Sequence, residues 1–330
     1  MSRKQLNVLA LVAAILITAV LPAGAYELWT NPLTFRNAGS GFSSDDVALT
    51  VWNGTVYFAD PGTHVIGRLG ANGQPIVIAG QYGTAGIADG VGTAAQFSQP
   101  SGIAVDAAGN MYVTERGSSR IRKVAPDGTV SAFSGRLYGF GFADGAPNVA
   151  IFSTPSAITI DPAGMLYVAD RGNNRIRKVT PAGDVTTLAG NNIAGRVDGS
   201  ATAARFDGPI DVAYGGGYVY VADQNNHAVR KVSTSTGAVT TVAGGITASP
   251  ADGSGATFGH VLGVTVTPDG TLFVAEDLNT VRRIDPDGWV TTAAGSFFFM
   301  SDREGTGYHA HLLSPRRLCA LGNNDVLLTD

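Results

Sequence analysis

The sequence predicts an all-β fold: a six-bladed β-propeller of four-stranded blades. One unit of about 55 residues recurs along the chain, and each copy holds four short runs rich in β-branched and aromatic residues. Charged residues make up 15% of the sequence, which disfavours a helical protein, and hydrophobic residues make up 44%, which disfavours disorder.

The unit is clearest in residues 81–135. Its four runs are GIAVD, NMYVTE, RIRKV and TVSAFSG, and the turns between them include AAGN and PDG. Copies follow at residues 136–190, 191–244 and 245–295, and an earlier copy that ends at Gly80 lacks the Asp-Gly loop of the others. Four strands per copy at this period are typical of propeller blades.

Counting the strand ends fixes the number of blades. Second strands end at six acids: Asp60, Glu115, Asp170, Asp223, Glu276 and Asp330. Fourth strands end at six glycines: Gly39, Gly80, Gly135, Gly190, Gly244 and Gly295. The segment that ends at Gly39, residues 26–39, aligns without a gap on residues 177–190. We therefore expect residues 26–39 to supply the two outer strands of the last blade, which closes the ring and leaves no open sheet edge.

The first 25 residues have the pattern of a signal peptide. The basic start MSRK precedes the apolar run LNVLALVAAILITAVL, and PAGA supplies small residues for cleavage after Ala25. An uncleaved membrane anchor is the alternative, for which the run is somewhat short. Residues 26–330 are thus predicted to be a single exported domain, periplasmic or extracellular, with no membrane attachment after cleavage.

The net charge disfavours one class of partner, and the cysteine content excludes an internal disulfide. Of the 22 basic residues, Arg3 and Lys4 leave with the signal, so 20 remain against 26 acids, a formal charge of −6. This balance disfavours nucleic acid as a partner. Cys319 is the single cysteine, which excludes an internal disulfide, so the fold must be stabilised by packing. The sequence contains no oligomerisation signal, and we expect a monomer.

The second blade carries a family resemblance. Its pattern, PSGIAVDxxGNxYVxE followed by RIRKVxPxGxV, resembles the NHL repeat family, and QNNHAVRKV (residues 224–232) comes near the Asn-His-Leu triplet that names it. The resemblance covers nearly the whole chain after residue 25 and implies a propeller. Such propellers mostly serve as binding platforms, and a minority are enzymes.

Most of the repeated residues are predicted to be structural. The second-strand acids should accept hydrogen bonds from loop N–H groups. Arg-Lys pairs such as Arg122-Lys123 and Arg177-Lys178 should extend charges to solvent from an outer strand. In the Asp-Gly loops, the Asp is predicted to cap a short helix whose last aromatic residue docks as a plug, with calcium binding as an alternative. Small residues at one position of each innermost strand, Cys319 among them, should limit bulk at the axis.

Departures from the repeat indicate the site. The face that carries the second-to-third and fourth-to-first connections is called the top. There, the first strands begin with Asp46, Gly102, Ala157, Asp211, Gly263 and Arg317 around the channel mouth. The charged departures and their neighbours are the ligand-binding candidates: Asp45, Asp46, Asp211, Arg316 and Arg317. An Asp–Arg ion pair that merely fills the mouth is the alternative.

The histidines also map to top-face loops. His260, His309 and His311 enter neighbouring blades and are the candidate zinc ligands, whereas His64 and His227 are expected in opposite or nearly opposite blades. Lyases that use this fold hold zinc with histidines from separate blades near the axis. No cofactor is predicted, with zinc or calcium as alternatives.

Two functions follow. The first is a non-catalytic exported platform that binds a protein, peptide or glycan on its top face, because no nucleophile–base pair is evident. The second is a metal-dependent enzyme of the lyase or lactonase kind, built around the mouth charges and histidines.

Overall fold

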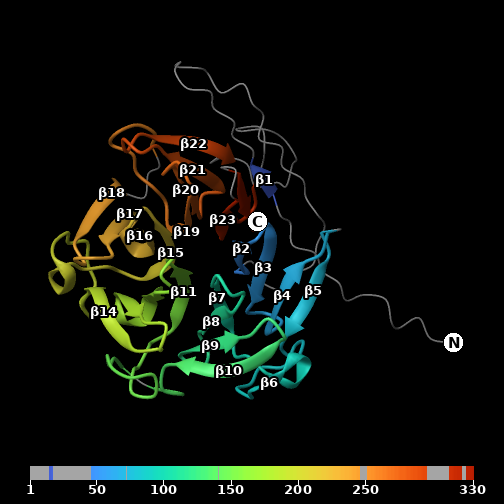
Figure 1. The fold of residues 1–330 in the computed structure, drawn as a ribbon. Helices are drawn as coiled ribbons and strands as arrows, with labels where there is room; N and C mark the ends of the chain where they lie inside the picture. The colour runs from blue at the N-terminus through green and yellow to red at the C-terminus, as the bar shows by residue number, and fades with distance from the viewer. Residues whose placement is uncertain are drawn as a thin grey trace.

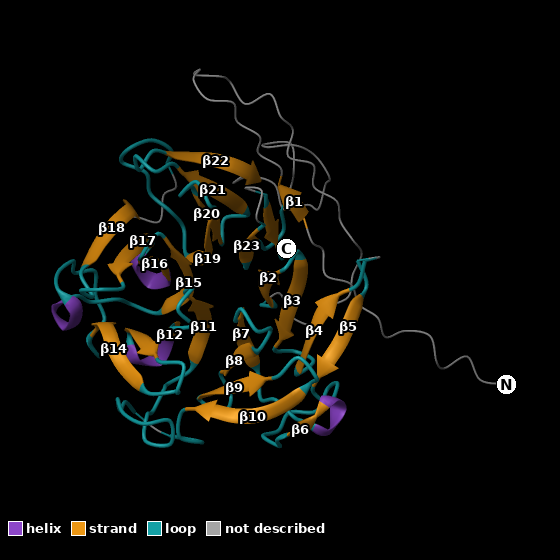
Figure 2. Cartoon of the chain, in the orientation of Figure 1, coloured by secondary structure: helices purple, strands orange, loops and turns teal. Residues whose placement is uncertain are grey.

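The computed structural model describes residues 15–17, 46–71, 73–139, 141–245, 251–295, 312–321 and 325–330. Its sheets are arranged radially around a central axis (Figure 1), and short 3-10 turns lie in the loops between strands (Figure 2). The predicted all-β propeller with four-stranded antiparallel blades is confirmed. None of the described residues forms a helix long and apolar enough to cross a membrane.

Within each blade the strands follow chain order from the axis outward. Blade 1 comprises β2 (Ala48–Trp52), β3 (Thr55–Asp60), β4 (Val65–Leu69) and β5 (Pro75–Ala79). Blade 2 comprises β7 (Pro100–Val105), β8 (Met111–Glu115), β9 (Arg120–Val124) and β10 (Thr129–Ser134), with β6 (Gly90–Val91) outside β10. Blade 3 comprises β11 (Pro155–Ile160), β12 (Leu166–Asp170), β13 (Arg175–Val179) and β14 (Val185–Gly190).

Blade 4 comprises β15 (Pro209–Gly215), β16 (Tyr218–Asp223), β17 (Ala228–Ser233) and β18 (Val239–Gly244). Blade 5 comprises β19 (Val261–Val266), β20 (Leu272–Glu276), β21 (Thr280–Ile284) and β22 (Val290–Gly295). Short 3-10 turns occur at η1 (Gly92–Ala94), η2 (Arg171–Asn173), η3 (Ala201–Ala203) and η4 (Gln224–Asn226).

The described residues thus form five complete blades and a sixth sheet of three strands. That sheet has the order β1 (Ile15–Ile17), β24 (Val326–Leu328), β23 (Leu318–Ala320). Residues 26–39, predicted to supply its outer strands, lie outside the described residues, and the strand that pairs with β24 opposite β23 is β1, which falls within the predicted signal peptide.

The hydrophobic core is divided among the seams between blades. One cluster joins Tyr167 of blade 3 to Val212 and Val221 of blade 4, and equivalent clusters join blades 1 and 2, blades 2 and 3, blades 4 and 5, and blade 5 and the sixth sheet. Each seam holds apolar side chains that alternate along the strands, because successive residues of a strand point to opposite faces. Stability is therefore spread over contacts between neighbouring blades.

The predicted aromatic plugs are present at the seams. They are Phe97, Phe152, Phe206 and Phe258, and all four have 0% exposure. Above each ring lies the guanidinium of a third-strand arginine, at 5.1–5.3 Å from the ring centroid.

The prediction that these arginines extend to solvent is wrong. Arg122, Arg177, Arg230 and Arg282 have 0% exposure. In blade 3, Arg177 Nη1 lies 2.7 Å from Asp170 and Nη2 lies 2.6 Å from Asp144, and both nitrogens also donate to the carbonyls of Ile151 and Ala143. A buried guanidinium needs several acceptors, and the repeat supplies them in every copy that has the arginine.

The second-strand acids accept loop N–H groups as predicted. Asp170 accepts from Ser153 N at 2.7 Å, and Glu115 accepts from Ser98 N at 2.8 Å. They also pair with the arginines, which the sequence interpretation missed.

The helix-cap prediction for the Asp-Gly loops is wrong. At η1 and η3, the turns that follow two of these loops, no side chain caps the turn. Instead the loop aspartate joins the third strand to the fourth: Asp144 pairs with Arg177 and accepts from Thr187 N at 3.1 Å. The carboxylate is used to hold the blade together.

Blade 1 departs from this arrangement. Gly67 faces Phe58 in the register where Arg177 faces Val168, and a Cβ on Gly67 would lie 2.3 Å from the Phe58 ring. Its second-strand acid, Asp60, accepts two turn N–H groups through Oδ1, but its buried Oδ2 has no hydrogen-bond partner. The phenylalanine fills the place of the arginine without replacing its charge.

Candidate functional site

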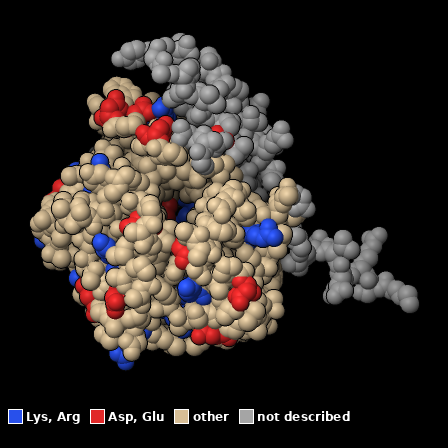
Figure 3. All heavy atoms as spheres, in the orientation of Figure 1, with Lys and Arg blue, Asp and Glu red and all other residues tan. Residues whose placement is uncertain are grey.

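A cavity of about 260 Å³ lies on the propeller axis, lined by β2, β7, β11, β15, β19 and β23. A space-filling view along the axis shows a central hollow with acidic and basic groups inside it (Figure 3). Small residues line the cavity at the predicted position, among them Ala48, Ala104 and Cys319. The Cys319 side chain is buried, and this burial raises the pKa of its thiol to about 12.

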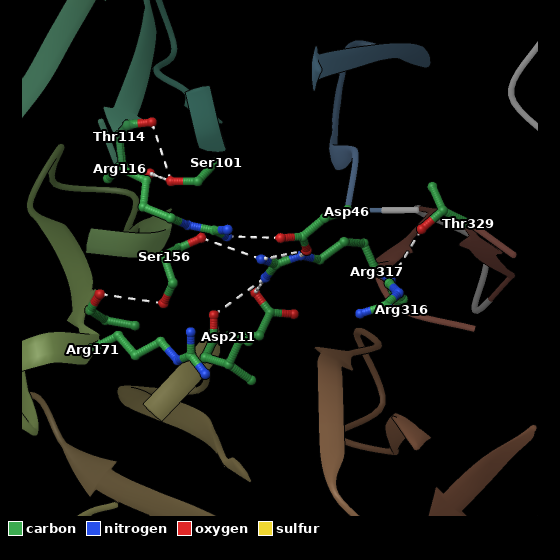
Figure 4. A network of polar contacts seen from close by, with 12 residues as sticks. Asp46, Ser101, Thr114, Arg116, Ser156, Arg171, Asp211, Arg316, Arg317 and Thr329 are labelled. Carbon is green, nitrogen blue, oxygen red and sulfur yellow. Dashed lines mark hydrogen bonds and ion pairs between the residues drawn. The ribbon is translucent and has the colours of Figure 1, made fainter. Parts of the chain in front are cut away.

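Arg317 occupies the top end of this cavity and is 3% exposed (Figure 4). Its Nε and Nη2 both lie 3.0 Å from Asp46 Oδ1, and Nη1 lies 3.1 Å from Asp211 Oδ1. It also donates to the carbonyls of Ile210 and Ser156, at 3.2 and 3.3 Å. A guanidinium offers five donor N–H groups in a rigid fork, which suits convergence of several acceptors.

The contacts around Arg317 join all six sheets. Arg317 itself enters the sixth sheet, Asp46 precedes blade 1, and Asp211 belongs to blade 4. Ser156 of blade 3 supplies a carbonyl, Asp211 accepts from Val264 N of blade 5 at 3.0 Å, and Arg116 of blade 2 contacts Asp46. The residues that break the repeat at the mouth therefore form a hub that ties the blades together.

The charges of this hub are strongly coupled. Burial would raise the pKa of Asp46, but the Arg317 and Arg116 guanidiniums outweigh it and hold that pKa below its ordinary value. Burial would likewise lower the pKa of Arg317, but Asp46 and Asp211 outweigh it and raise the pKa. The alternative predicted for the mouth, an Asp–Arg ion pair that fills it, describes Arg317 with both Asp46 and Asp211.

Two further arginines point toward the same space and were not predicted. Arg116 and Arg171 each follow the acid that ends a second strand, and in Figure 4 both extend toward Arg317. Arg116 Nη2 lies 2.7 Å from Asp46 Oδ2, while its buried Nε has no hydrogen-bond partner among the described residues. Arg171 Nη2 donates to Gln224 at 2.8 Å.

The guanidiniums of Arg116, Arg171 and Arg317 are close enough to repel one another. Burial, together with the Arg116 and Arg317 guanidiniums, lowers the pKa of Arg171 below its ordinary value, although Asp46 acts against this. Three guanidiniums thus surround two carboxylates, Asp46 and Asp211. Among the described residues, the exposed edge of the mouth, formed by Asp46, Arg116 and Arg171, carries more guanidinium groups than carboxylates.

The remaining candidates lie at the margin of the mouth. Arg316 is half-buried, donates through its side chain to Ser314 Oγ at 3.2 Å, and donates through its backbone to Thr329 O at 2.9 Å. Asp45 lies outside the described residues, as do His309 and His311.

His64 follows β3 of blade 1 and His227 follows β16 of blade 4, so the two lie in opposite blades as predicted, but the proximity of His227 to His260 was not predicted. His260 Nδ1 lies 2.8 Å from Asp277 Oδ2, and its ring is 4.5 Å from that of His227, centroid to centroid. His227 therefore neighbours His260, and its buried Nδ1 has no hydrogen-bond partner. Within the described part of the chain, no group of three or more His, Cys, Asp or Glu side chains is placed to hold a metal ion.

Known sequences support the family resemblance. The sequence model of the NHL repeat matches residues 97–124 and 152–179. NHL repeat-containing protein 2 of Gallus gallus is 38% identical over 27% of this chain and 12% of the relative's own length. Protein SUPPRESSOR OF QUENCHING 1, chloroplastic, of Arabidopsis thaliana is 29% identical over 58% of this chain and 19% of that protein. The aligned segments thus cover less than a fifth of either relative.

Solved structures support the fold. An auxiliary nutrient binding protein from Bacteroides ovatus superposes with a TM-score of 0.62 at 15% identity, covering 97% of this chain and 77% of the other. A catalytically inactive virginiamycin B lyase from Staphylococcus aureus, solved with quinupristin, gives a TM-score of 0.54 at 17% identity, covering 87% and 79%. At these identities the likeness concerns the fold.

Replacing Arg317 tests the hub. We expect Arg317→Met to lower the free energy of unfolding by about 3–5 kcal/mol, because it leaves two carboxylates without their buried partner. Arg116→Met is the matched control. Arg116 contacts the same Asp46 but its side chain is 27% exposed, so its loss should cost no more than about 1 kcal/mol. Urea unfolding followed by circular dichroism measures both, and equal losses would contradict the hub.

Proposed function

The chain is an NHL repeat protein, and we propose that it is an exported, non-catalytic binding platform that captures a protein, peptide or glycan at its top-face mouth. The proposal takes residues 1–25 as a removed signal, so β1 leaves with it, and takes the propeller as six-bladed, with residues 26–39 completing the last blade beside β24. It rests on the fold, on the family, and above all on the charge arrangement at the mouth.

The observation that carries the proposal is the excess of guanidinium over carboxylate at an accessible edge. Arg317 is fully engaged in the hub, but Arg116 and Arg171 lie beside it with few protein acceptors: Asp46 for the first and Gln224 for the second. Planar guanidiniums recognise carboxylates through paired hydrogen bonds. We therefore infer that the ligand presents a carboxylate group to this edge.

In this proposal some residues of the mouth contact the ligand and others hold those residues in position. Arg116 and Arg171 contact the ligand, while Asp46 orients Arg116 through the 2.7 Å ion pair. Asp211 and Arg317 hold the rim in place, and Asp45 and Arg316 flank it. The hub keeps the blades at a fixed separation, so the two contacting arginines remain preorganised for binding.

A panel of acidic peptides and uronic-acid glycans, each with a neutral amide analogue, tests this proposal. Wild type should retain acidic members and release their neutral analogues. Arg116→Gln with Arg171→Gln should weaken that binding by about 10- to 100-fold, the equivalent of about 1.5–3 kcal/mol for charged hydrogen bonds. The melting temperature should change little, because both side chains are half-buried at most.

Arg68→Gln, a cation on β4 of blade 1, serves as the control and should bind as wild type does. Equal retention of acidic and neutral probes, or undiminished binding by the double variant, would refute the mouth as the binding site.

A metal-dependent enzyme of the lyase or lactonase kind is the second candidate. The observation that favours it is the close His227–His260 ring pair, because imidazole is a common ligand of zinc, although the described residues place no third ligand around a common ion. Elemental analysis of dialysed protein separates the two. The platform predicts less than one equivalent of zinc or calcium, and a full retained equivalent would favour the enzyme.

A further inference from the structure

A second, larger concavity lies on the face opposite the mouth, where the first-to-second strand hairpins turn. We call it the underside groove. It has a volume of about 990 Å³ and is lined by the hairpins of blades 1, 4 and 5 together with Ala320 and Leu321 of the sixth sheet. It shares Val51, Tyr214 and Val266 with the axial cavity, so the channel that Arg317 fills at its top end widens into this groove below.

The groove lies where blades 4 and 5 lack an aspartate that blades 2 and 3 have at the start of the first-to-second strand hairpin. In blade 3 the hairpin begins with Asp161, which accepts from turn N–H groups and from the Tyr167 hydroxyl at 3.0 Å. Asp106 and Tyr112 repeat this pair in blade 2, at 3.2 Å. The aligned position in blade 4 is a glycine, Gly215, and in blade 5 it is Thr267, Oγ1 of which donates to Asp269.

Because blade 4 lacks that aspartate, the hydroxyl of its second-strand tyrosine, Tyr220, has lost the acceptor that its counterparts use. Tyr220 occupies the register of Tyr112 and Tyr167, because it pairs with Ala213 as they pair with Ala104 and Thr159. Its hydroxyl makes no hydrogen bond to any described residue, whereas the hydroxyls of its two counterparts each donate to an aspartate. Tyr220 lines the groove, so this hydroxyl is left for a ligand.

The adjacent turn adds an aromatic surface on an open wall. Gly216 and Gly217 have φ of 58° and 83°, and no atom lies within 4 Å of where a Cβ of either would be. Tyr218 follows them, is 37% exposed, and has the Lys231 ammonium 3.8 Å from its ring centroid. The groove thus combines a tyrosine ring with a turn whose backbone a ligand can approach closely.

We propose that the underside groove binds a neutral oligosaccharide. A pyranose presents C–H faces that stack on aromatic rings and hydroxyls that pair with groups such as the Tyr220 hydroxyl and the exposed Asn53 side chain. Apart from tyrosine, Asp269 is the one ionisable residue in the lining, and its carboxylate already accepts from Thr267 and Thr271. The lining offers an anionic ligand no cation of its own, since Lys231 beside it lies over the Tyr218 ring, and an apolar ligand would leave the hydroxyls unpaired. The volume is within the range of about 300–1,000 Å³ typical of ligand sites.

Isothermal titration calorimetry with cellohexaose, maltohexaose, xylohexaose and chitohexaose tests the proposal. At least one of them should bind the wild-type protein. Tyr218→Ala should weaken that sugar by at least tenfold through loss of the stacking surface. Tyr220→Phe removes only a hydroxyl and should weaken it by roughly three- to tenfold. The second variant keeps the test valid if the first fails to fold.

Tyr82→Ala is the matched control, since Tyr82 is 55% exposed in a fourth-to-first connection on the opposite face, and it should bind as wild type does. Arg116→Gln with Arg171→Gln should also bind the sugar normally, which separates this site from the mouth. Absence of binding by all four sugars would overturn the proposal, as would undiminished binding by Tyr218→Ala and Tyr220→Phe.

Discussion

A guanidinium withdrawn from water must find acceptors for its N–H groups, and this demand organises the propeller. Four seams contain such a group, each placed between a second-strand acid and a loop aspartate. Because removing either partner would leave a buried charge unpaired, strand, loop and acid are held in one arrangement. The aromatic plug beneath the guanidinium completes the seam with apolar contact and a cation–π interaction.

One more buried guanidinium, that of Arg317, lies on the propeller axis and also needs acceptors for its N–H groups. Arg317 draws acceptors from blades 1, 3 and 4, and the carboxylates that it engages reach blades 2 and 5. This hub fills the top of the channel, so the mouth offers its charged rim rather than its interior to a ligand. On the underside, where no charged hub exists among the described residues, the channel widens into the tyrosine-lined groove. Loss of a repeated residue thus gives each face its distinct chemistry.

The sequence revealed the blades because strand periodicity and turn residues are local properties. The burial of Arg177 could not be predicted from local sequence, because it depends on a distant loop. A third-strand Arg-Lys pair resembles any solvent-facing pair until the loop that carries Asp144, 33 residues earlier, folds over it. Arg116 and Arg171 were missed for a similar reason: they follow repeated acids, and only the ring geometry brings them beside Asp46. Their departure from Pro61, Gln224 and Asp277 at the aligned positions was the available signal.

The central claim is that a buried arginine supports each of the four seams that contain one. It is tested most directly by comparing two neighbours on β13. Arg177→Met and Lys178→Met remove adjacent positive charges, one with 0% exposure in the seam and one half-buried on the opposite face of the strand. Urea unfolding at neutral pH should show a loss of about 3–5 kcal/mol for Arg177→Met and within about 0.5 kcal/mol for Lys178→Met. Similar small losses for both would contradict the claim.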